Sequence, residues 1–387
     1  MITSAFPFIV LLIFLAGSLK LIESKSRLKI FQLLPAIVVL YFTIMVLSTL
    51  GLWQQTQEIN TAYKTLKVNI LPAMIFLMLL NADLRQIRKL GSKIIFAFLA
   101  SSLSIAVAFV LAYSLFLPMM NAESWKTFAA LSGSWMGGTG NMAAIQMALD
   151  VPDSSMGYTL LIDSIDYAIW VMLLLALVPF AKKFDNWVGT DTSKLDQVAE
   201  ALSEQKQEIV GDQTTSLLFL LGLSLLVSVT TQYLATTLPT SVFFTTTTWT
   251  VILVTIIGVS AALTPLSRLF GATELSNIML FLIVSLIASR ADFAELTQAP
   301  LYILMGLSIL LFHGLMMVAF AKLFKFDLFT CGIASLANIG GVASAPILAA
   351  AYSRALIPIG VLMALLGYVI GTGGGLLVGK VLYMLSS

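Results

Sequence analysis

The chain has 387 residues, of which 59% are hydrophobic and only 10% are charged. Ordinary soluble domains carry about 25% charged residues, so this composition predicts an all-α polytopic membrane protein. The net charge of +2 is too small to indicate nucleic acid as a partner. A single cysteine and a single histidine exclude an internal disulfide and the usual cysteine or histidine metal sites, so we expect no metal cofactor beyond a coupling ion.

Apolar segments occur as two sets of six, separated by one polar stretch that is the only candidate linker. In chain order they are 5–22, 31–53, 68–82, 93–117, 126–149 and 158–181, the polar stretch 182–215, and then 216–236, 242–263, 274–289, 300–321, 328–352 and 355–384. Within the polar stretch, a short amphipathic helix is indicated by four apolar residues on one face: Leu195, Val198, Leu202 and Ile209.

The two sets resemble one another in sequence. FLMLLNADL (76–84) parallels SLIASRADF (285–293), and TFAALSGSWMGGTGNMA (127–143) parallels TCGIASLANIGGVASAP (330–346). The second pairing aligns Gly137 and Gly138 with Gly340 and Gly341, and the following segments align Tyr167 with Tyr368. We interpret this as an internal duplication of residues 1–181 and 216–387, joined by a cytoplasmic linker at 182–215.

The distribution of lysine and arginine favours inverted repeats. If every segment crossed the membrane, 10 basic residues would lie inside and 11 outside. If 126–149 and 328–352 are instead re-entrant hairpins, each half has five transmembrane helices and the counts become 16 inside and 5 outside. The positive-inside rule therefore favours the hairpins, with both termini outside. The five outer residues are Lys64, Lys67, Lys126, Arg290 and Lys380.

Each predicted hairpin breaks at a pair of glycines. Glycine costs a helix about 1 kcal/mol relative to alanine, and a turn at membrane depth is tolerated only inside protein or beside a wet cavity. The second half-helix of each hairpin would begin there, with free backbone N–H groups and a positive dipole end. Such ends bind anions. We expect Thr139 or Asn141 to cap the first half-helix and Ser344 to cap the second.

The predicted substrate-binding residues are those around the two breaks: Gly137, Gly138, Thr139, Asn141, Gly340, Gly341 and Ser344. A purely structural alternative is that the glycines only allow close helix packing.

Two acids lie three residues apart in LLIDSIDYAIW, where they share a helix face. Asp166 is expected deep in the membrane, and intramembrane acids are functional candidates by default. We expect Asp163 and Asp166 to serve a coupling ion, with Ser134, Ser335 and Asn338 as further ligands; Ser132 is a weaker candidate. The alternative is that Asp163 and these polar residues only make structural hydrogen bonds, as we expect for His313 in the core.

The motifs GSWMGGTGNMAAI and LANIGGVASAP resemble those of the YjcL-like membrane proteins. The overall layout is similar to the secondary carriers that include glutamate:sodium symporters, citrate carriers, bile-acid symporters and cation/proton antiporters. This resemblance implies scaffold helices at 5–82 and 216–289 and a mobile, elevator-type core at 93–181 and 300–384. It places Gly137, Gly138, Asn141, Gly340 and Gly341 where the hairpins cross. The second hairpin reads Gly340-Gly341-Val342-Ala343, which is shorter than the glycine motif of the glutamate and citrate carriers, so their substrates are not carried over.

The sequence thus favours a secondary transporter that couples Na⁺ or H⁺ to a small organic anion. The alternative is a cation/proton antiporter that uses Asp163 and Asp166 without an organic substrate. A channel is weaker, because it does not need inverted repeats. An intramembrane enzyme is weaker, because both candidate acids lie on one helix and no serine nucleophile is paired with a base. No P-loop indicates ATP-driven transport. We expect a homodimer in the lipid bilayer of a bacterial inner (plasma) membrane.

Overall fold

The computed structural model describes residues 1–25, 35–82, 84–190, 212–241, 243–291, 296 and 299–386. Over these residues the chain is helical, and the only strand-like pairing is an isolated bridge between Ile2 and Trp53. The predicted all-α class is therefore confirmed for this part of the chain. The amphipathic helix expected around Leu195 to Ile209 lies outside the described residues.

Seven of the described helices are long and apolar enough to cross a membrane. They are α1 (Ala5–Lys25), α4 (Gln57–Leu80), α6 (Ser92–Phe116), α9 (Met156–Leu177), α12 (Gln213–Ala235), α15 (Ala299–Phe324) and α18 (Ile357–Ser386). A span needs about 20 apolar residues, so this composition and length establish an integral membrane protein.

The other three predicted spans are shorter than that length. Helix α3 (Ala36–Thr49) has 14 residues, and α13 (Thr246–Ala262) and α14 (Ala272–Ala288) have 17 each. At 1.5 Å per residue, 17 residues rise about 26 Å, slightly less than a hydrocarbon core of about 30 Å.

The predicted linker is partly helical. Helix α10 (Ala181–Val188) follows α9 after a single 3₁₀ turn, η3 (Val178–Phe180), and ends at Gly189 in the left-handed conformation. Before α12, the Asp212 carboxylate accepts a hydrogen bond from the Thr215 backbone N–H at 3.1 Å. Hydrogen bonds from that N–H and from the Thr215 hydroxyl hold the Asp212 pKa below its ordinary value. The described parts of the predicted linker 182–215 are therefore helical at both ends, in α10 and at the start of α12.

Two pairs of short helices fold back on themselves at the double glycines. The first hairpin is α7 (Ser124–Gly137) with α8 (Thr139–Ala148), and the second is α16 (Leu328–Ile339) with α17 (Gly341–Tyr352). A Cβ on Gly133 would lie 2.7 Å from Ile145 Cγ1, although a straight helix would separate these residues by about 18 Å. In the second hairpin the rings of Phe329 and Tyr352 are 5.2 Å apart.

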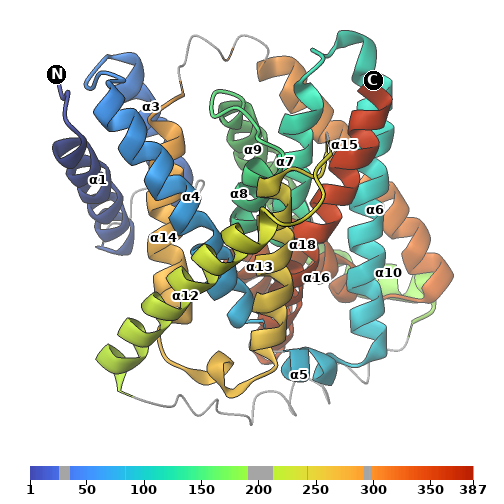
Figure 1. Ribbon diagram of the computed structural model, residues 1–387. Helices are drawn as coiled ribbons and strands as arrows, with labels where there is room; N and C mark the ends of the chain where they lie inside the picture. The colour runs from blue at the N-terminus through green and yellow to red at the C-terminus, as the bar shows by residue number, and fades with distance from the viewer. Residues whose placement is uncertain are drawn as a thin grey trace.

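The hairpins begin at opposite ends of α6. The first starts beside the end of α6, where the hydroxyls of Tyr113 and Ser124 are 3.2 Å apart. The second starts beside its beginning, where Lys93 Nζ lies 3.9 Å from Asp327 Oδ2. Both chain termini lie in the upper part of Figure 1, whereas α5 (Leu84–Ile87) lies near the bottom and α10 lies in the lower half.

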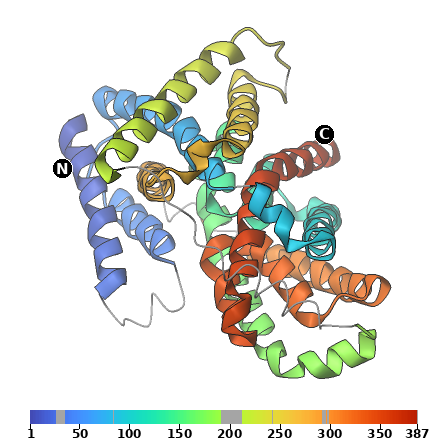
Figure 2. The same cartoon turned by 90° about the horizontal axis from the view of Figure 1, so that it is seen from below.

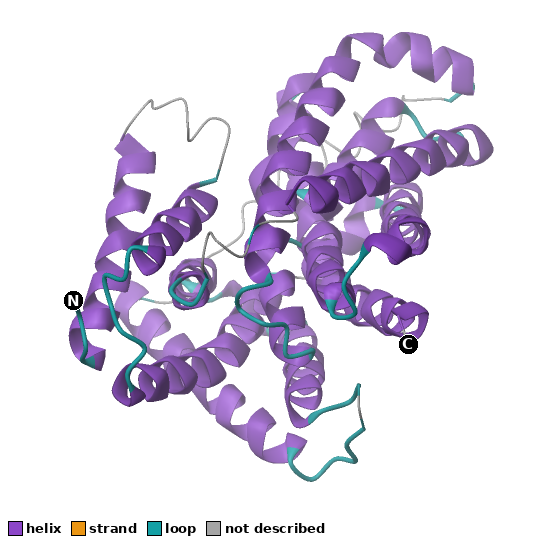
Figure 3. Cartoon of the chain, turned by 90° about the horizontal axis from the view of Figure 1, so that it is seen from above, coloured by secondary structure: helices purple, strands orange, loops and turns teal. Residues whose placement is uncertain are grey.

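The helices gather in two groups, which Figure 2 shows from below and Figure 3 from above. One group consists of α1, α3, α4, α12, α13 and α14, and the other of α6, α9, α15, α18 and the two hairpins. Each half of the sequence contributes to both groups. Contacts between the groups run chiefly through α8, which packs on α4 and α13.

Candidate functional site

The helix breaks lie where the sequence predicts them. Helix α7 ends at Gly137 and α8 begins at Thr139, while α16 ends at Ile339 and α17 begins at Gly341. The second glycine of each pair has a positive φ, +89° at Gly138 and +58° at Gly341. Residues with a Cβ adopt this region only at a cost of about 1–2 kcal/mol, which explains glycine at both positions.

The tips of the two hairpins meet on α18. A Cβ on Gly367 would lie 3.4 Å from the carbonyl oxygen of Met136 in the first hairpin and 3.4 Å from that of Ala337 in the second. The missing side chain at Gly367 therefore lets both tips approach the same point of one helix. The two breaks, about 200 residues apart in sequence, are neighbours in space.

Two equivalent tyrosines cover the tips crosswise. A Cβ on Gly138 of the first hairpin would lie 3.8 Å from Tyr368 Cε1 on α18, which belongs to the second half. A Cβ on Gly340 of the second hairpin would lie 2.6 Å from Tyr167 Cε2 on α9, which belongs to the first half. Each half thus places its tyrosine against the other half's break.

The tips form one wall of a cavity of about 520 Å³. Its opposite wall comes from the other helix group, through Met74 and Met78 of α4 and Thr273, Ser276 and Asn277 of α14. The cavity extends to Asn81 and Ser267, where Arg85 hydrogen-bonds Ser267 at 3.3 Å, so it reaches the end of the molecule where α5 lies. Among the residues that the structure describes, its lining holds one acid and no lysine or arginine.

The acid in the cavity is Asp163. Its Oδ1 accepts hydrogen bonds from Ser134 Oγ at 3.1 Å and from the Trp135 indole N–H at 2.9 Å, both on α7. These two donors fix the carboxylate against the first hairpin, next to the break. The arrangement places a negative charge beside two helix N-termini, which can hold an anion together with a cation.

Some of the predicted site residues reach the cavity and others do not. Those that line it are Gly138, Thr139, Gly340, Gly341, Ser134 and Asp163. Those that lie elsewhere are Gly137, Asn141, Ser344, Asp166, Ser335, Asn338 and Ser132.

The expected side-chain caps are absent from both half-helices, so this prediction is wrong. Helix α8 has Gly138 as its N-cap and α17 has Gly340, neither with a side-chain cap hydrogen bond, and neither Thr139, Asn141 nor Ser344 takes that role. Asn141 instead donates to the Gly137 carbonyl at 2.7 Å and accepts from Thr372 Oγ1 at 2.6 Å. It therefore ties the hairpin to α18, and the first N–H groups of α8 stay uncapped at the cavity wall.

Around the second hairpin, the polar residues bond to neighbouring helices. Ser335 Oγ lies 2.7 Å from His313 Nε2 and accepts from the Trp170 indole at 2.8 Å. The Asn338 side-chain oxygen accepts from Ser102 Oγ at 2.7 Å. Ser104 Oγ completes the set at 2.7 Å from His313 Nδ1, which confirms His313 as a hydrogen-bonded core residue.

Sequence reasoning missed the wall that α14 provides. Thr273, Ser276 and Asn277 are polar residues at the start of an apolar segment, spaced i, i+3 and i+4. That spacing places them on one helix face, which was the available signal. It was hidden because segment ends normally carry polar residues at the membrane surface.

At the other end of the molecule, a polar cluster joins the two helix groups. Asp153, in the loop after α8, accepts hydrogen bonds from Lys67 Nζ at 2.7 Å, from Gln146 Nε2 at 2.7 Å and from the Tyr63 hydroxyl at 2.5 Å. The Arg290 guanidinium stacks 4.4 Å from the Tyr63 ring centroid. We call Tyr63, Lys67, Gln146, Asp153 and Arg290 the end cluster. The end cluster holds α4 to the end of the first hairpin. This lies at the end of the molecule opposite to the one that the cavity reaches.

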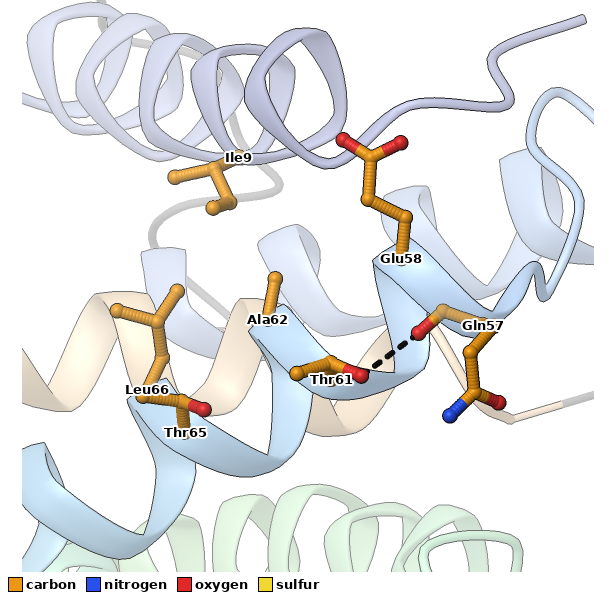
Figure 4. Close-up of a pocket in the computed structure, with 7 residues that line it drawn as sticks. All are labelled: Ile9, Gln57, Glu58, Thr61, Ala62, Thr65 and Leu66. Atoms are coloured by element: carbon orange, nitrogen blue, oxygen red, sulfur yellow. Dashed lines mark hydrogen bonds between the residues drawn. The ribbon is translucent and has the colours of Figure 1, made fainter.

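A second hollow, of about 750 Å³, lies between α1 and α4 (Figure 4). It is open and mostly apolar, and its acid, Glu58, accepts a hydrogen bond from the Ala5 backbone N–H at 2.9 Å. Its polar Thr61 bonds back to the Gln57 carbonyl at 2.8 Å. It gathers no group of chemistry-bearing side chains, and it is separate from the hairpin tips.

The fold and site together define an integral membrane protein built of apolar helices, in which two glycine-broken hairpins wall one internal cavity. The sequence profile of a family described as "Protein of unknown function (DUF819)" matches residues 10–385. The chain therefore belongs to the DUF819 family. It is also 25% identical over 341 residues to the uncharacterized membrane protein YjcL of Bacillus subtilis (strain 168), covering 83% of this chain and 84% of that protein.

Proposed function

We propose that this protein is a cation-coupled secondary transporter of a small organic anion that works by alternating access. One observation carries the proposal: the tips of two glycine-broken hairpins wall a single cavity between two helix groups. Irregular backbone at membrane depth is a feature of transport sites, where half-helix ends meet a ligand near the midplane.

The chemistry of the cavity supports an anion that travels with a cation. Two uncapped helix N-termini, at Thr139 and Gly341, offer N–H donors and partial positive charge, each worth about 0.3–2 kcal/mol to an anion. The glycines let a ligand approach the backbone closely. Asp163 would repel a bare anion, because no basic residue offsets it among the described residues of the cavity lining. A coupling cation, Na⁺ or H⁺, removes that repulsion.

Several contacts support two inverted repeats. The hairpins begin at opposite ends of α6. Helices that would be equivalent in the two repeats pack on one another, α4 on α14 and α6 on α15. In this proposal the helices at 5–82 and 216–289 are the scaffold. The core at 93–181 and 300–384 carries both hairpins past it like an elevator.

The distribution of basic residues supports an orientation. Lys93, Lys322 and Lys325 lie at the end of the molecule that holds α10, through contacts to Thr190 and Trp187. The positive-inside rule makes this the cytoplasmic end of a bacterial inner (plasma) membrane, with both termini outside. The cavity then faces the cytoplasm, and the end cluster closes the outer side. We also propose a homodimer.

A cation/proton antiporter without an organic substrate is the second candidate. The specific observation in its favour is that the described part of the cavity lining contains an acid and lacks a basic residue. The two candidates differ in whether an organic anion binds.

The test is isothermal titration of the detergent-purified protein with a panel of small carboxylates, with and without Na⁺ and across pH. Gly341→Ala should weaken binding of any carboxylate at least about tenfold, a loss of about 1.4 kcal/mol. A Cβ at this position meets no atom within 4 Å, so it would occupy the cavity itself.

Gly189→Ala is the matched control. Gly189 also has a positive φ, +77°, and open space around its Cβ, but it ends α10 far from the cavity lining. If Gly189→Ala, which introduces similar backbone strain, leaves the affinity for carboxylates unchanged, the loss of affinity in Gly341→Ala comes from the hairpin tip. If carboxylates bind and Gly341→Ala binds them as well as wild type, the breaks serve packing alone. If no carboxylate binds under any condition, the antiporter candidate takes the lead.

A further inference from the structure

Asp166 is an acid without a hydrogen-bonding partner. Its side chain is 0% exposed, and neither carboxyl oxygen has a hydrogen bond among the described residues. It lies in the middle of α9, a helix long and apolar enough to span the membrane. An ionised carboxylate in such a place costs several kcal/mol unless donors or a cation compensate it. A neutral carboxylic acid avoids most of that cost.

The neighbouring helix leaves room for this carboxyl group. A Cβ on Gly306 of α15 would collide with Asp166 Oδ2 and with Ile162 Cγ2. Glycine inside a helix costs about 1 kcal/mol relative to alanine, and Gly306 lies well within the 26 residues of α15. The carboxyl therefore occupies a cradle that any larger residue at 306 would fill.

No positive charge faces this cradle from the helices that form it. Helix α9 has no basic residue, and Lys322 near the end of α15 donates to the Trp187 carbonyl. On α15, Tyr302 stacks on Tyr158, and both ring nitrogens of His313 are engaged by serines. The remaining titratable neighbours on α9 are Asp163, one turn earlier, and Tyr167, and both line the cavity.

We propose that Asp166 is a proton-binding site and that the coupling ion is H⁺. Only the coupling role rests on the proposed function, since the proton site itself can be tested without a substrate. The reaction is the binding of one proton by the carboxylate to give the neutral acid, with no other bond made or broken. Asp163 lies one turn away and reaches the cavity, so it is the group through which protons pass between cavity water and Asp166.

The proton also explains how an anion could be admitted. With Asp166 neutral, α9 carries one negative charge, at Asp163, instead of two. Binding of the proton therefore favours binding of an anion, and binding of an anion favours binding of the proton. Releasing the proton on the other side of the membrane would weaken the hold on the anion there.

The test is thermal unfolding of the detergent-purified wild type and Asp166→Asn, in Na⁺ or choline buffers, from about pH 5 to about pH 9. The folded protein holds the proton, whereas an unfolded aspartate releases it above about pH 4. Wild-type stability should therefore fall as pH rises, relative to Asp166→Asn, whose neutral amide has no proton to lose. The variant should melt at an equal or higher temperature than wild type at about pH 8.

Asp150→Asn is the matched control, because Asp150 is exposed and its positive φ, +49°, is one that asparagine tolerates. It should leave the pH profile of wild type unchanged. Stabilisation of wild type by Na⁺ that Asp166→Asn abolishes would overturn the proposal in favour of a Na⁺ site. A pH profile that Asp166→Asn leaves unchanged would also overturn it, because the acid would then be ionised in the folded protein.

The cradle offers an independent measurement. Gly306→Ala should lower the melting temperature, and Gly306→Ala with Asp166→Ala should recover part of the loss, because the new methyl group then has space. Gly222→Ala, with nothing within 4 Å of its Cβ, is the control for a glycine in an apolar helix. If Gly306→Ala is as harmless as Gly222→Ala, the carboxyl does not lie where the proposal needs it.

Discussion

At the residue scale, the same chemical group takes different roles according to which neighbour it faces. Asp163 and Asp166 are both aspartates on α9, yet one accepts two hydrogen bonds at the cavity and the other packs against Gly306. Residues three apart on a helix point about 60° apart. Because α9 packs between α7 and α15, that angle is enough to direct Asp163 toward α7 and Asp166 toward α15. The sequence could predict both acids but could not assign the partners.

Asn141 illustrates a residue whose effect should appear in stability before it appears in binding. Asn141→Ala leaves the Gly137 carbonyl and the Thr372 hydroxyl without their buried partner. The loss should be about 1–3 kcal/mol in the free energy of unfolding. Thermal unfolding of Asn141→Ala, Thr372→Val and the double variant measures it, and the double variant should lose less than the sum of the two. Strict additivity would contradict a direct Asn141–Thr372 hydrogen bond.

At the element scale, the breaks were predictable and the lengths were not. Three glycines within residues 137–140 strongly predict a helix break, and in the structure α7 ends and α8 begins there. The capping prediction failed because the N-cap position of each half-helix is a glycine, Gly138 or Gly340, which has no side chain to cap with. Helices α3 and α13 are shorter than their predicted segments, because hydropathy runs on into the flanking apolar turns, whereas α14 has nearly the length predicted by 274–289. The pairing of the two tips on Gly367 depends on tertiary packing that no local pattern encodes.

The end cluster should couple two elements energetically. A double-mutant cycle of Lys67→Ala and Asp153→Ala should give a coupling of roughly 0.5–3 kcal/mol, because both side chains are less than one fifth exposed (18% and 19%). The Lys126–Glu123 pair is the control, since Glu123 is 66% exposed and such pairs contribute little. Thermal or denaturant unfolding measures both cycles. Equal coupling in the two pairs would mean that the cluster does not tie α4 to the loop after α8.

At the scale of the whole molecule, the composition predicted an all-helical membrane protein, and the apolar helices of the described residues and the relative named as a membrane protein agree with it. It also predicted that the two breaks, at Gly137–Asn141 and Gly340–Ser344, would meet, and residues of both, among them Gly138, Thr139, Gly340 and Gly341, line one cavity. It did not predict the opposite wall, because that wall belongs to the other helix group. A site between two groups depends on how they dock, which the hydropathy of single segments does not specify.

The central claim is that this cavity opens to each side of the membrane in turn. The most direct measurement is labelling of Thr139→Cys with a membrane-impermeant maleimide, in a Cys331→Ser background, in intact cells and in inside-out vesicles. Lys182→Cys on α10 and Glu123→Cys before α7, both exposed, are the reference sites for the proposed inner and outer faces. Thr139→Cys should react from both sides, and faster from outside when Asp153→Asn loosens the end cluster. Reaction of Thr139→Cys from the inner side alone, unchanged by Asp153→Asn, would show a static cavity and contradict the account.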